Sequence, residues 1–428
     1  MSTLIQQVIS RRIWDSRGRP TVEVDLVLEN GVRGRGVAPA GASRGSREAA
    51  DLRDGGPALG GFGIERALAN VNGPIAKGVI GLDALDQQGV DNVLIALDGT
   101  STKAKLGGNA TVATSLAALH AAAASAGLPL WRYLANDQPV RMPLPEIQIF
   151  GGGAHAGRRV DIQDFLIMPI GAASFDEAMV MAAEVYRAAG ELMERTGGRA
   201  GVADEGGWWP NFKSNEQALE MLTRSIDAAG YRHDQVAISL DIAASEFGRG
   251  GRYTLGLEQR TFDTGAWLEV LYGWVASYPI LSVEDPVAED DAEGMRAFTA
   301  AVGHRIQVVG DDFLVTNAAL VRDAIAQRSC NAVLLKPNQA GTVSETRAAM
   351  EVARASNWGR VVSARSGETE DVAIAHLAIG WNAGQLKVGS FARSERMAKW
   401  NECLRIEAEL GAKAIYAGLD ALPMVSSP

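Results

Sequence analysis

The sequence has little cysteine, little positive charge and no long apolar run, and each shortage excludes a class of protein. Two cysteines in 428 residues, Cys330 and Cys403, cannot form a disulfide framework, which favours a reducing compartment. A formal net charge of -10 argues against a nucleic-acid surface, which is normally basic. No apolar run approaches the length of a membrane span, and the first residues lack the apolar core of a signal peptide. We therefore expect a cytoplasmic protein with neither a nucleic acid nor a membrane as its partner.

The first part of the chain predicts a small domain that mixes strands and helices. Residues 20–36 alternate apolar and acidic side chains and contain an Asn30-Gly31 turn, which predicts an antiparallel hairpin with one solvent-exposed face. Residues 38–46, APAGASRGS, are small and glycine-rich and predict a mobile loop. An alanine-rich helix is expected over about 111–127. These features predict an N-terminal α+β domain at 1–137, which ends where prolines interrupt the pattern.

The remainder, residues 138–428, repeats a strand–loop–helix pattern. Its apolar runs are DFLIMP, AISLD, ILSVED, IQVVGDD, AVLLKPN, VVSARS and QLKVGS. Capping boxes, such as Ser174 with Glu177 and Ser214 with Gln217, mark helix starts between the runs. Repeated units of this kind predict an α/β domain, a closed parallel (β/α)8 barrel. The active site of such a barrel lies at the carboxyl ends of its strands.

Three acidic residues stand at the ends of consecutive predicted strands: Asp241, Glu284 and Asp311. Three carboxylates in one cleft repel one another, and oxygen ligands suit a hard cation such as Mg²⁺. The alternative is that each acid forms a structural ion pair with a lysine or an arginine. Their occurrence on three consecutive strands favours the metal site.

A lysine and a glutamate are candidates for moving protons. Lys336 follows the run AVLL, and a buried ammonium group beside a cation is expected to have a lowered pKa, which suits a general base. The alternative is a salt bridge to a metal carboxylate. Glu205 lies in the loop GVADEGGWWP, where it is either a general acid kept protonated by its surroundings or a turn residue facing water. Together with a metal, the pair predicts proton abstraction beside a carboxylate, followed by loss of a leaving group.

Cationic and hydroxyl groups near the last strands predict an anion site. Arg365, Ser366 and Lys387 can hold a phosphate or a carboxylate, and an arginine can do so with two parallel hydrogen bonds. His155 lies in the glycine-rich stretch GGGAHAGRR. A single loop histidine is more often a surface residue, but the glycines permit close approach to a ligand. His155 is therefore a further candidate for the site.

A set of motifs runs in order along essentially the whole chain. The motifs are DSRGRPTVEV, GGAHA with VDIQDF, DEGG with PN, SLDIAASEF, SVEDPVAEDD, VVGDDFLVTN, LLKPNQAGT, RSGETED and ARSERMAKWNE. This set resembles the enolases. The resemblance implies an N-terminal α+β domain, a barrel domain and a homodimer or higher homo-oligomer. It also implies one tightly bound Mg²⁺ and a second that binds with the substrate, a phosphorylated or phosphonylated glycerate.

The resemblance also implies roles by position. Lys336 resembles the base that removes the proton from carbon 2, and Glu205 resembles the acid that helps the hydroxyl leave carbon 3. His155 resembles a histidine of a flexible loop near the phosphate. Asp241, Glu284 and Asp311 resemble the ligands of the first Mg²⁺, and Ser43 resembles a ligand of the second. The residues that match substrate contacts are Gln163, Arg365, Ser366 and Lys387.

Several positions depart from the family pattern on the phosphate and hydroxyl side of the site. Enolases have His where Ala364 stands, and they have Glu where Asp164 stands, so Asp164 joins the candidate catalytic residues. The other departures are Ala40 and Arg44 in the first loop, Gly151 in place of Asn, Arg158 and Arg159 just downstream, and Trp208-Trp209 after DEGG.

These departures predict a changed substrate. Ala364 leaves room beside the anion, and Arg44, Arg158 and Arg159 can bring positive charge to the same side, so all four are candidate substrate-binding residues. They suit a 2-phosphoglycerate analogue with a larger or more anionic phosphorus group. The specialised branch that forms carboxyphosphonoenolpyruvate, in phosphonate and phosphinate antibiotic biosynthesis, is similar in this respect. The alternatives are an authentic enolase that forms phosphoenolpyruvate in glycolysis and a non-catalytic enolase-like binding protein.

Overall fold

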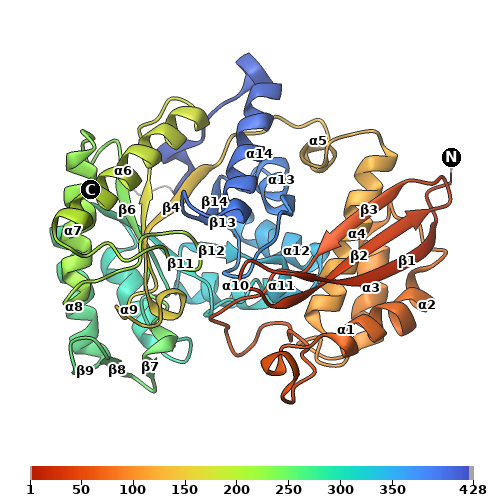
Figure 1. The fold of residues 1–428 in the computed structure, drawn as a ribbon, viewed down its shortest axis with the longest axis horizontal. Helices are drawn as coiled ribbons and strands as arrows, with labels where there is room; N and C mark the ends of the chain where they lie inside the picture. The colour runs from red at the N-terminus through yellow and green to blue at the C-terminus, as the bar shows by residue number, and fades with distance from the viewer. Residues whose placement is uncertain (1, 424–428) are drawn as a thin grey trace.

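A computed structural model describes residues 2–423 of the chain (Figure 1). Met1 and residues 424–428, which end the predicted second domain, lie outside the described residues. The chain forms an N-terminal part of strands and helices beside a closed eight-stranded barrel. This arrangement confirms the predicted α/β fold.

The N-terminal part is an antiparallel sheet covered by helices. Its strands, in order across the sheet, are β1 (Ile5–Trp14), β2 (Pro20–Leu28) and β3 (Arg33–Val37). Its helices are α1 (Glu65–Asn70), α2 (Ala76–Val79), α3 (Gln87–Asp98), α4 (Gly108–Ser125) and α5 (Leu130–Ala135). Helix α4 lies so close to β3 that a Cβ atom at Gly34 or Gly36 would lie 2.1 or 2.2 Å from its backbone. Both positions therefore require glycine.

The predicted solvent-exposed face of this hairpin is present at its arginines, but its acidic residues are covered. Glu23 and Asp25 on β2 are 5% and 0% exposed. Arginines of the neighbouring strands cover them: Arg11 Nη2 lies 2.5 Å from Asp25 Oδ2, and Arg35 Nε lies 2.9 Å from Asp25 Oδ1. The alternating pattern thus marked one apolar buried face and one face of ion pairs, on which the acids are buried and the side chains of Arg33 and Arg35 are 53% and 54% exposed.

Eight strands close into the barrel in the order β10-β11-β12-β13-β14-β4-β5-β6. They are β4 (Leu144–Gly151), β5 (Asp164–Met168), β6 (Ala237–Asp241), β10 (Ile280–Glu284), β11 (Gln307–Gly310), β12 (Ala332–Leu335), β13 (Gly359–Ser363) and β14 (Gln385–Gly389). The sequence did not indicate β4 as a strand, because Glu146 and Gln148 interrupt its apolar run. Both side chains lie inside the barrel and are 2% and 0% exposed.

The barrel is not entirely parallel, which corrects a second expectation. Strand β5 pairs antiparallel with both β4 and β6. The connection between β4 and β5, residues 152–163, contains one short 3₁₀ helix and no crossover helix. A connection this short and without a crossover helix favours antiparallel pairing. Asp164, at the start of β5, consequently pairs with Asp241 at the end of β6.

Helices surround the barrel, and a small sheet lies on its outside (Figure 1). The helices are α6 (Phe175–Arg195), α7 (Asn215–Ala228), α8 (Thr264–Ser277), α9 (Ala292–Val302), α10 (Ala318–Gln327), α11 (Pro337–Ala340), α12 (Val343–Ala355), α13 (Ala373–Gly380) and α14 (Ser394–Leu410). The sheet contains β7 (Gly248–Arg249), β8 (Arg252–Leu255) and β9 (Arg260–Asp263). Ser174 and Ser214 cap α6 and α7 as predicted. Between residues 2 and 423, no helix combines the length and apolar character needed to cross a bilayer.

Candidate active site

The polar residues predicted at the strand ends meet at one end of the barrel. Asp241 and Glu284 end β6 and β10, whereas Asp311 and Lys336 follow β11 and β12. The antiparallel direction of β5 brings Asp164 to the same end. A small pocket of about 20 Å³ lies there. Its lining residues are Gly41, Ala42, Ser43, His155, Gln163, Asp164, Glu205, Asp241, Lys336, Ser363, Ala364, Arg365, Ser366, Lys387 and Val388.

The three predicted metal ligands contact lysines in this structure. Lys387 Nζ donates to Asp241 Oδ2 at 2.9 Å and to Glu284 Oε2 at 2.8 Å. Lys336 Nζ donates to Asp311 Oδ2 at 2.5 Å. The ion pairs considered as an alternative are therefore present. They do not satisfy every carboxylate oxygen, because buried Glu284 Oε1 has no hydrogen-bond partner among the described residues.

The carboxylate cluster fits a hard divalent cation. Burial raises the pKa of Glu284 well above its ordinary value, and the negative charge of Asp241 raises it further. Excess buried negative charge of this kind is relieved either by protonation or by a cation, and carboxylate oxygens are the ligands that Mg²⁺ prefers. The unpartnered Oε1 of Glu284 has a lone pair free to coordinate a metal ion. We therefore propose Asp241, Glu284 and Asp311 as the residues that would hold Mg²⁺.

Two further aspartates belong to the cluster, and the sequence-based prediction missed them. Ligand atoms of Asp285, Asp311 and Asp312 lie within 4.8 Å of one another. Asp285 accepts the backbone N–H groups of Asp311 and Asp312 at 2.9 and 2.7 Å. Burial raises the pKa of Asp285 to about 8. The acidic doublets in SVEDP and VVGDD were the available signal.

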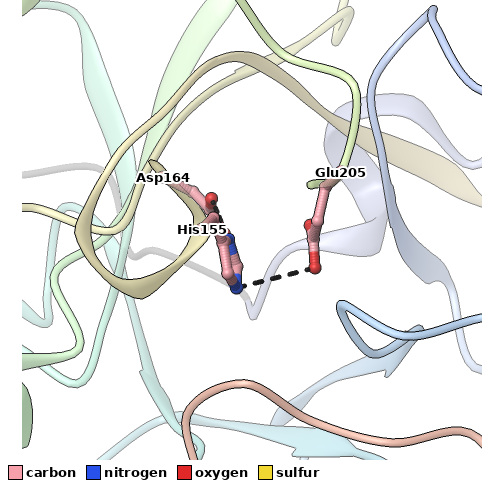
Figure 2. Close-up of side chains that lie close together, drawn as sticks. All are labelled: His155, Asp164 and Glu205. Atoms are coloured by element: carbon pink, nitrogen blue, oxygen red, sulfur yellow. Dashed lines mark hydrogen bonds and ion pairs between the residues drawn. The ribbon is translucent and has the colours of Figure 1, made fainter. Parts of the chain in front are cut away.

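His155 and Asp164 lie together with Glu205, the candidate general acid, on one side of the pocket, here called the acid side (Figure 2). His155 Nδ1 lies 3.1 Å from Asp164 Oδ1, and His155 Nε2 lies 3.8 Å from Glu205 Oε1. All three side chains are buried, so the alternatives of a surface histidine and a water-facing glutamate are wrong. Figure 2 shows the His155 imidazole with Asp164 on one side and Glu205 on the other.

The protonation states of this group follow from burial and mutual contact. Burial lowers the pKa of His155, but the carboxylates of Glu205 and Asp164 outweigh it and raise that pKa to about 9. Burial raises the pKa of Asp164, but His155 outweighs it and lowers that pKa to about 2. Burial also raises the pKa of Glu205 above its ordinary value. The raised value suits the predicted general acid.

Lys336 differs from its expected protonation behaviour. Burial lowers the pKa of its ammonium group, but the adjacent Asp311 carboxylate outweighs burial, and the pKa lies above its ordinary value. The lowered pKa is expected beside a cation, so it stays a prediction for the metal-bound site. The physical reason for the raised pKa is the short ion pair, which stabilises the charged form.

The predicted anion site is closed by residues of the N-terminal part. Arg365 Nη1 donates to Glu48 Oε2 at 2.9 Å, and Arg365 Nη2 donates to the carbonyl of Ser43 at 2.9 Å. Ser366 Oγ accepts the backbone N–H of Ala42 at 2.7 Å. Gln163 Nε2 donates to Asp241 Oδ2 at 3.0 Å. Glu48 was not predicted, and no local sequence pattern marks it.

The three arginines predicted from the departures do not line the pocket. Arg158 Nη2 donates to Glu246 Oε2 at 2.8 Å with its side chain 69% exposed, and Arg159 is exposed. The Arg44 side chain is 52% exposed and lies 4.0 Å from Asp51. Ala364 does line the pocket, but about 20 Å³ holds little more than one water molecule. The room expected beside the anion is not open in this structure.

Comparison with protein families covers nearly the whole chain. The family model described as the enolase N-terminal domain matches residues 5–134. The model described as the enolase C-terminal TIM barrel domain matches residues 139–424. The two matches coincide with the sheet-and-helix part and the barrel, and the pocket lies where they meet. The chain belongs to the enolase family.

Proposed function

We propose that this protein is a Mg²⁺-dependent hydro-lyase that removes water from 2-phosphoglycerate or a close analogue. The observation that carries the proposal is that Lys336, Glu205 and Arg365 line one pocket beside buried carboxylates. A base, an acid and an anion-binding group in one pocket are what an elimination beside a carboxylate requires. Membership of the enolase family supports the same reaction class.

Each group has one task in this reaction. Lys336 takes the proton from carbon 2, the electron pair of that C–H bond forms the double bond to carbon 3, and Glu205 protonates the hydroxyl that leaves as water. Arg365 holds the phosphorus group with its planar guanidinium. Mg²⁺ at Asp241, Glu284 and Asp311 would stabilise the negative charge that develops on the substrate carboxylate. The homodimer implied by the resemblance is part of this proposal.

Substrate entry requires that the loop 38–46 open. Ser43 and Ala42 cover the pocket through the bonds to Arg365 and Ser366 described above. Ala40 pairs with Gly367, and Arg17 Nη2 donates to the Ala40 carbonyl at 2.7 Å. A pocket of about 20 Å³ does not accommodate a phosphorylated three-carbon acid. We propose that these bonds break to admit the substrate and form again over it.

One observation favours the narrower specificity for carboxyphosphonoenolpyruvate formation. Ala364 lies in the pocket lining next to Arg365, where a histidine would place an imidazole. Once the loop opens, the absent imidazole leaves space beside the phosphorus group for an additional carboxylate.

The test is competition between 2-phosphoglycerate and its phosphonoformyl analogue with Mg²⁺, followed by phosphorus NMR, for the native protein and the Ala364→His variant. We expect the native protein to prefer the analogue and the variant to shift toward 2-phosphoglycerate. An unchanged ratio would remove Ala364 as a specificity determinant. No product from either substrate, with Mg²⁺ still raising the melting temperature, would favour the non-catalytic binding protein.

A further inference from the structure

A buried amide side chain connects the loop GVADEGGWWP (residues 201–210, here the acid loop, which carries Glu205) to Asp164. Gln148 on β4 is 0% exposed. Its Nε2 donates to Asp164 Oδ1, and its Oε1 accepts the backbone N–H of Gly207 at 2.8 Å. Asp164 Oδ1 also lies 3.1 Å from His155 Nδ1. Gly207 lies two residues after Glu205, so this one side chain joins both parts of the acid site.

Two glycines leave the space that Gln148 fills. A Cβ atom at Gly207 would lie 2.4 Å from Gln148 Oε1, which real Cβ atoms essentially never do. A Cβ atom at Gly151 would lie 3.0 Å from the same oxygen and 2.7 Å from the Cβ of Ala203. Gly151 is one of the departures found in the sequence, and Asp164, a shorter acid than glutamate, is another. Both departures therefore adjoin Gln148.

Trp208 also holds the acid loop, through one bond to β4 and one to α6. The Trp208 backbone N–H donates to the Ile149 carbonyl at 2.8 Å, and its indole Nε1 donates to the Tyr186 carbonyl at 2.9 Å. The aromatic rings of Tyr186 and Trp208 stack with their centroids 4.6 Å apart. Trp208 holds the loop against α6, whereas Gln148 holds it against Asp164. Contacts with β4 and with α6 therefore both hold the segment that carries Glu205.

We propose that Gln148 is a positioning residue of the acid step: it fixes the loop that carries Glu205 and orients Asp164 toward His155. The assignment of an acid step depends on the proposed function, whereas the placement of the loop does not. Both hydrogen bonds need the full length of the glutamine, because β4 carries the side chain between two partners. A shorter amide reaches one partner at most.

The first test replaces Gln148 by methionine, which has a similar volume and makes neither hydrogen bond. Gln307→Met is the matched control, because Gln307 is also a fully buried barrel amide and bonds Ser282 and Gln385 instead. Amide hydrogen exchange is measured in both variants without substrate. We expect Gly207 to exchange about 10-fold faster in Gln148→Met only, since it loses its acceptor. Equal exchange in native protein and variant would overturn the proposal.

The second test separates the acid step from the base step with 2-phosphoglycerate and Mg²⁺. In Gln148→Met, kcat for dehydration should fall about 10- to 100-fold, while KM and proton exchange at carbon 2 stay near native values. A parallel loss of exchange and dehydration would instead indicate general damage and contradict a positioning role. If the native protein catalyses neither process with 2-phosphoglycerate or with its phosphonoformyl analogue, the proposed function fails, and the hydrogen-exchange result still decides the role of Gln148.

A third variant pair tests the length argument. Gln148→Asn shortens the amide by one methylene, and Asp164→Glu lengthens the acid by one. We expect either change alone to lower kcat and the double variant to recover part of it, because the amide again reaches the acid. Additive losses in the double variant would show that the two residues do not act through this contact.

Discussion

Lys336 and Asp311 form the shortest of the lysine contacts at the strand ends, and the role proposed for Lys336 requires it to lose its proton. Lys336→Ala should abolish proton exchange at carbon 2 of 2-phosphoglycerate, a loss of at least about 10²- to 10⁴-fold. Exchange is measured by proton NMR in D₂O with Mg²⁺. Lys77→Ala, on the exposed side of α2, is the control and should exchange normally. Appreciable exchange in Lys336→Ala would remove this residue as the base.

His155 makes the stability of the protein depend on alkaline pH. Its folded-state pKa of about 9 lies above the ordinary 6.5, so the protonated imidazole contributes stability that is complete below pH 6.5 and lost as the pH rises through 9. His155→Gln should therefore show a flatter melting temperature between pH 6.5 and 9.5 in metal-free buffer. His233→Gln, which changes an exposed histidine beside Asp227, should keep the native slope. An unchanged slope in His155→Gln would contradict the raised pKa.

Residues at strand ends could be predicted from the sequence, and residues that join distant segments could not. Asp241, Glu284, Asp311 and Lys336 each follow an apolar run that marks its own strand. Glu48 and Gln148 have no such marker, because each acquires its partners only when separate segments fold together. Arg158 is an error of the other kind, a residue predicted in the site that lies outside it. Its charge suggested that it binds the substrate anion, but in the structure it pairs with Glu246.

At the level of elements, the loop 38–46 closes the pocket by backbone contact. A Cβ atom at Gly41 would lie 2.0 Å from Arg365 Nη2 and 2.7 Å from the Ser43 carbonyl. Gly41→Ala should prevent closure and lower kcat/KM for 2-phosphoglycerate by about 10²-fold, as misplacement by about 1 Å can. Gly273→Ala on α8, where a Cβ atom meets nothing within 4 Å, is the control. Native kcat/KM in Gly41→Ala would show that closure is not needed.

The barrel strands show why element order was predicted better than strand direction. Apolar runs located seven of the eight strands, but a run has the same composition in either direction. The direction of β5 followed from the short connection before it, residues 152–163, in which the sequence contains glycines and no helical pattern. Strand β4 was missed because it carries two polar side chains, Glu146 and Gln148, into the barrel interior, and these interrupt the apolar run that would have marked it as a strand.

At the level of the whole molecule, both matched parts of the chain contribute to the pocket. Ser43, which lines the pocket, comes from the N-terminal part, as does Glu48, which pairs with Arg365. The metal, base and acid candidates come from the barrel. The Arg365–Glu48 ion pair, with both side chains at most 5% exposed, joins the two parts at the anion site. Closure of the loop and packing of the two parts are therefore coupled. The proposed boundary at residue 137 remains a prediction.

The most direct test of the central claim is steady-state dehydration of 2-phosphoglycerate and of its phosphonoformyl analogue, followed by the absorbance of the enol product with and without Mg²⁺. We predict Mg²⁺-dependent turnover of at least one of the two substrates at about 1–10³ per second, and none in Lys336→Ala. No turnover of either substrate by folded protein whose melting temperature rises with Mg²⁺ would contradict the assignment as a hydro-lyase.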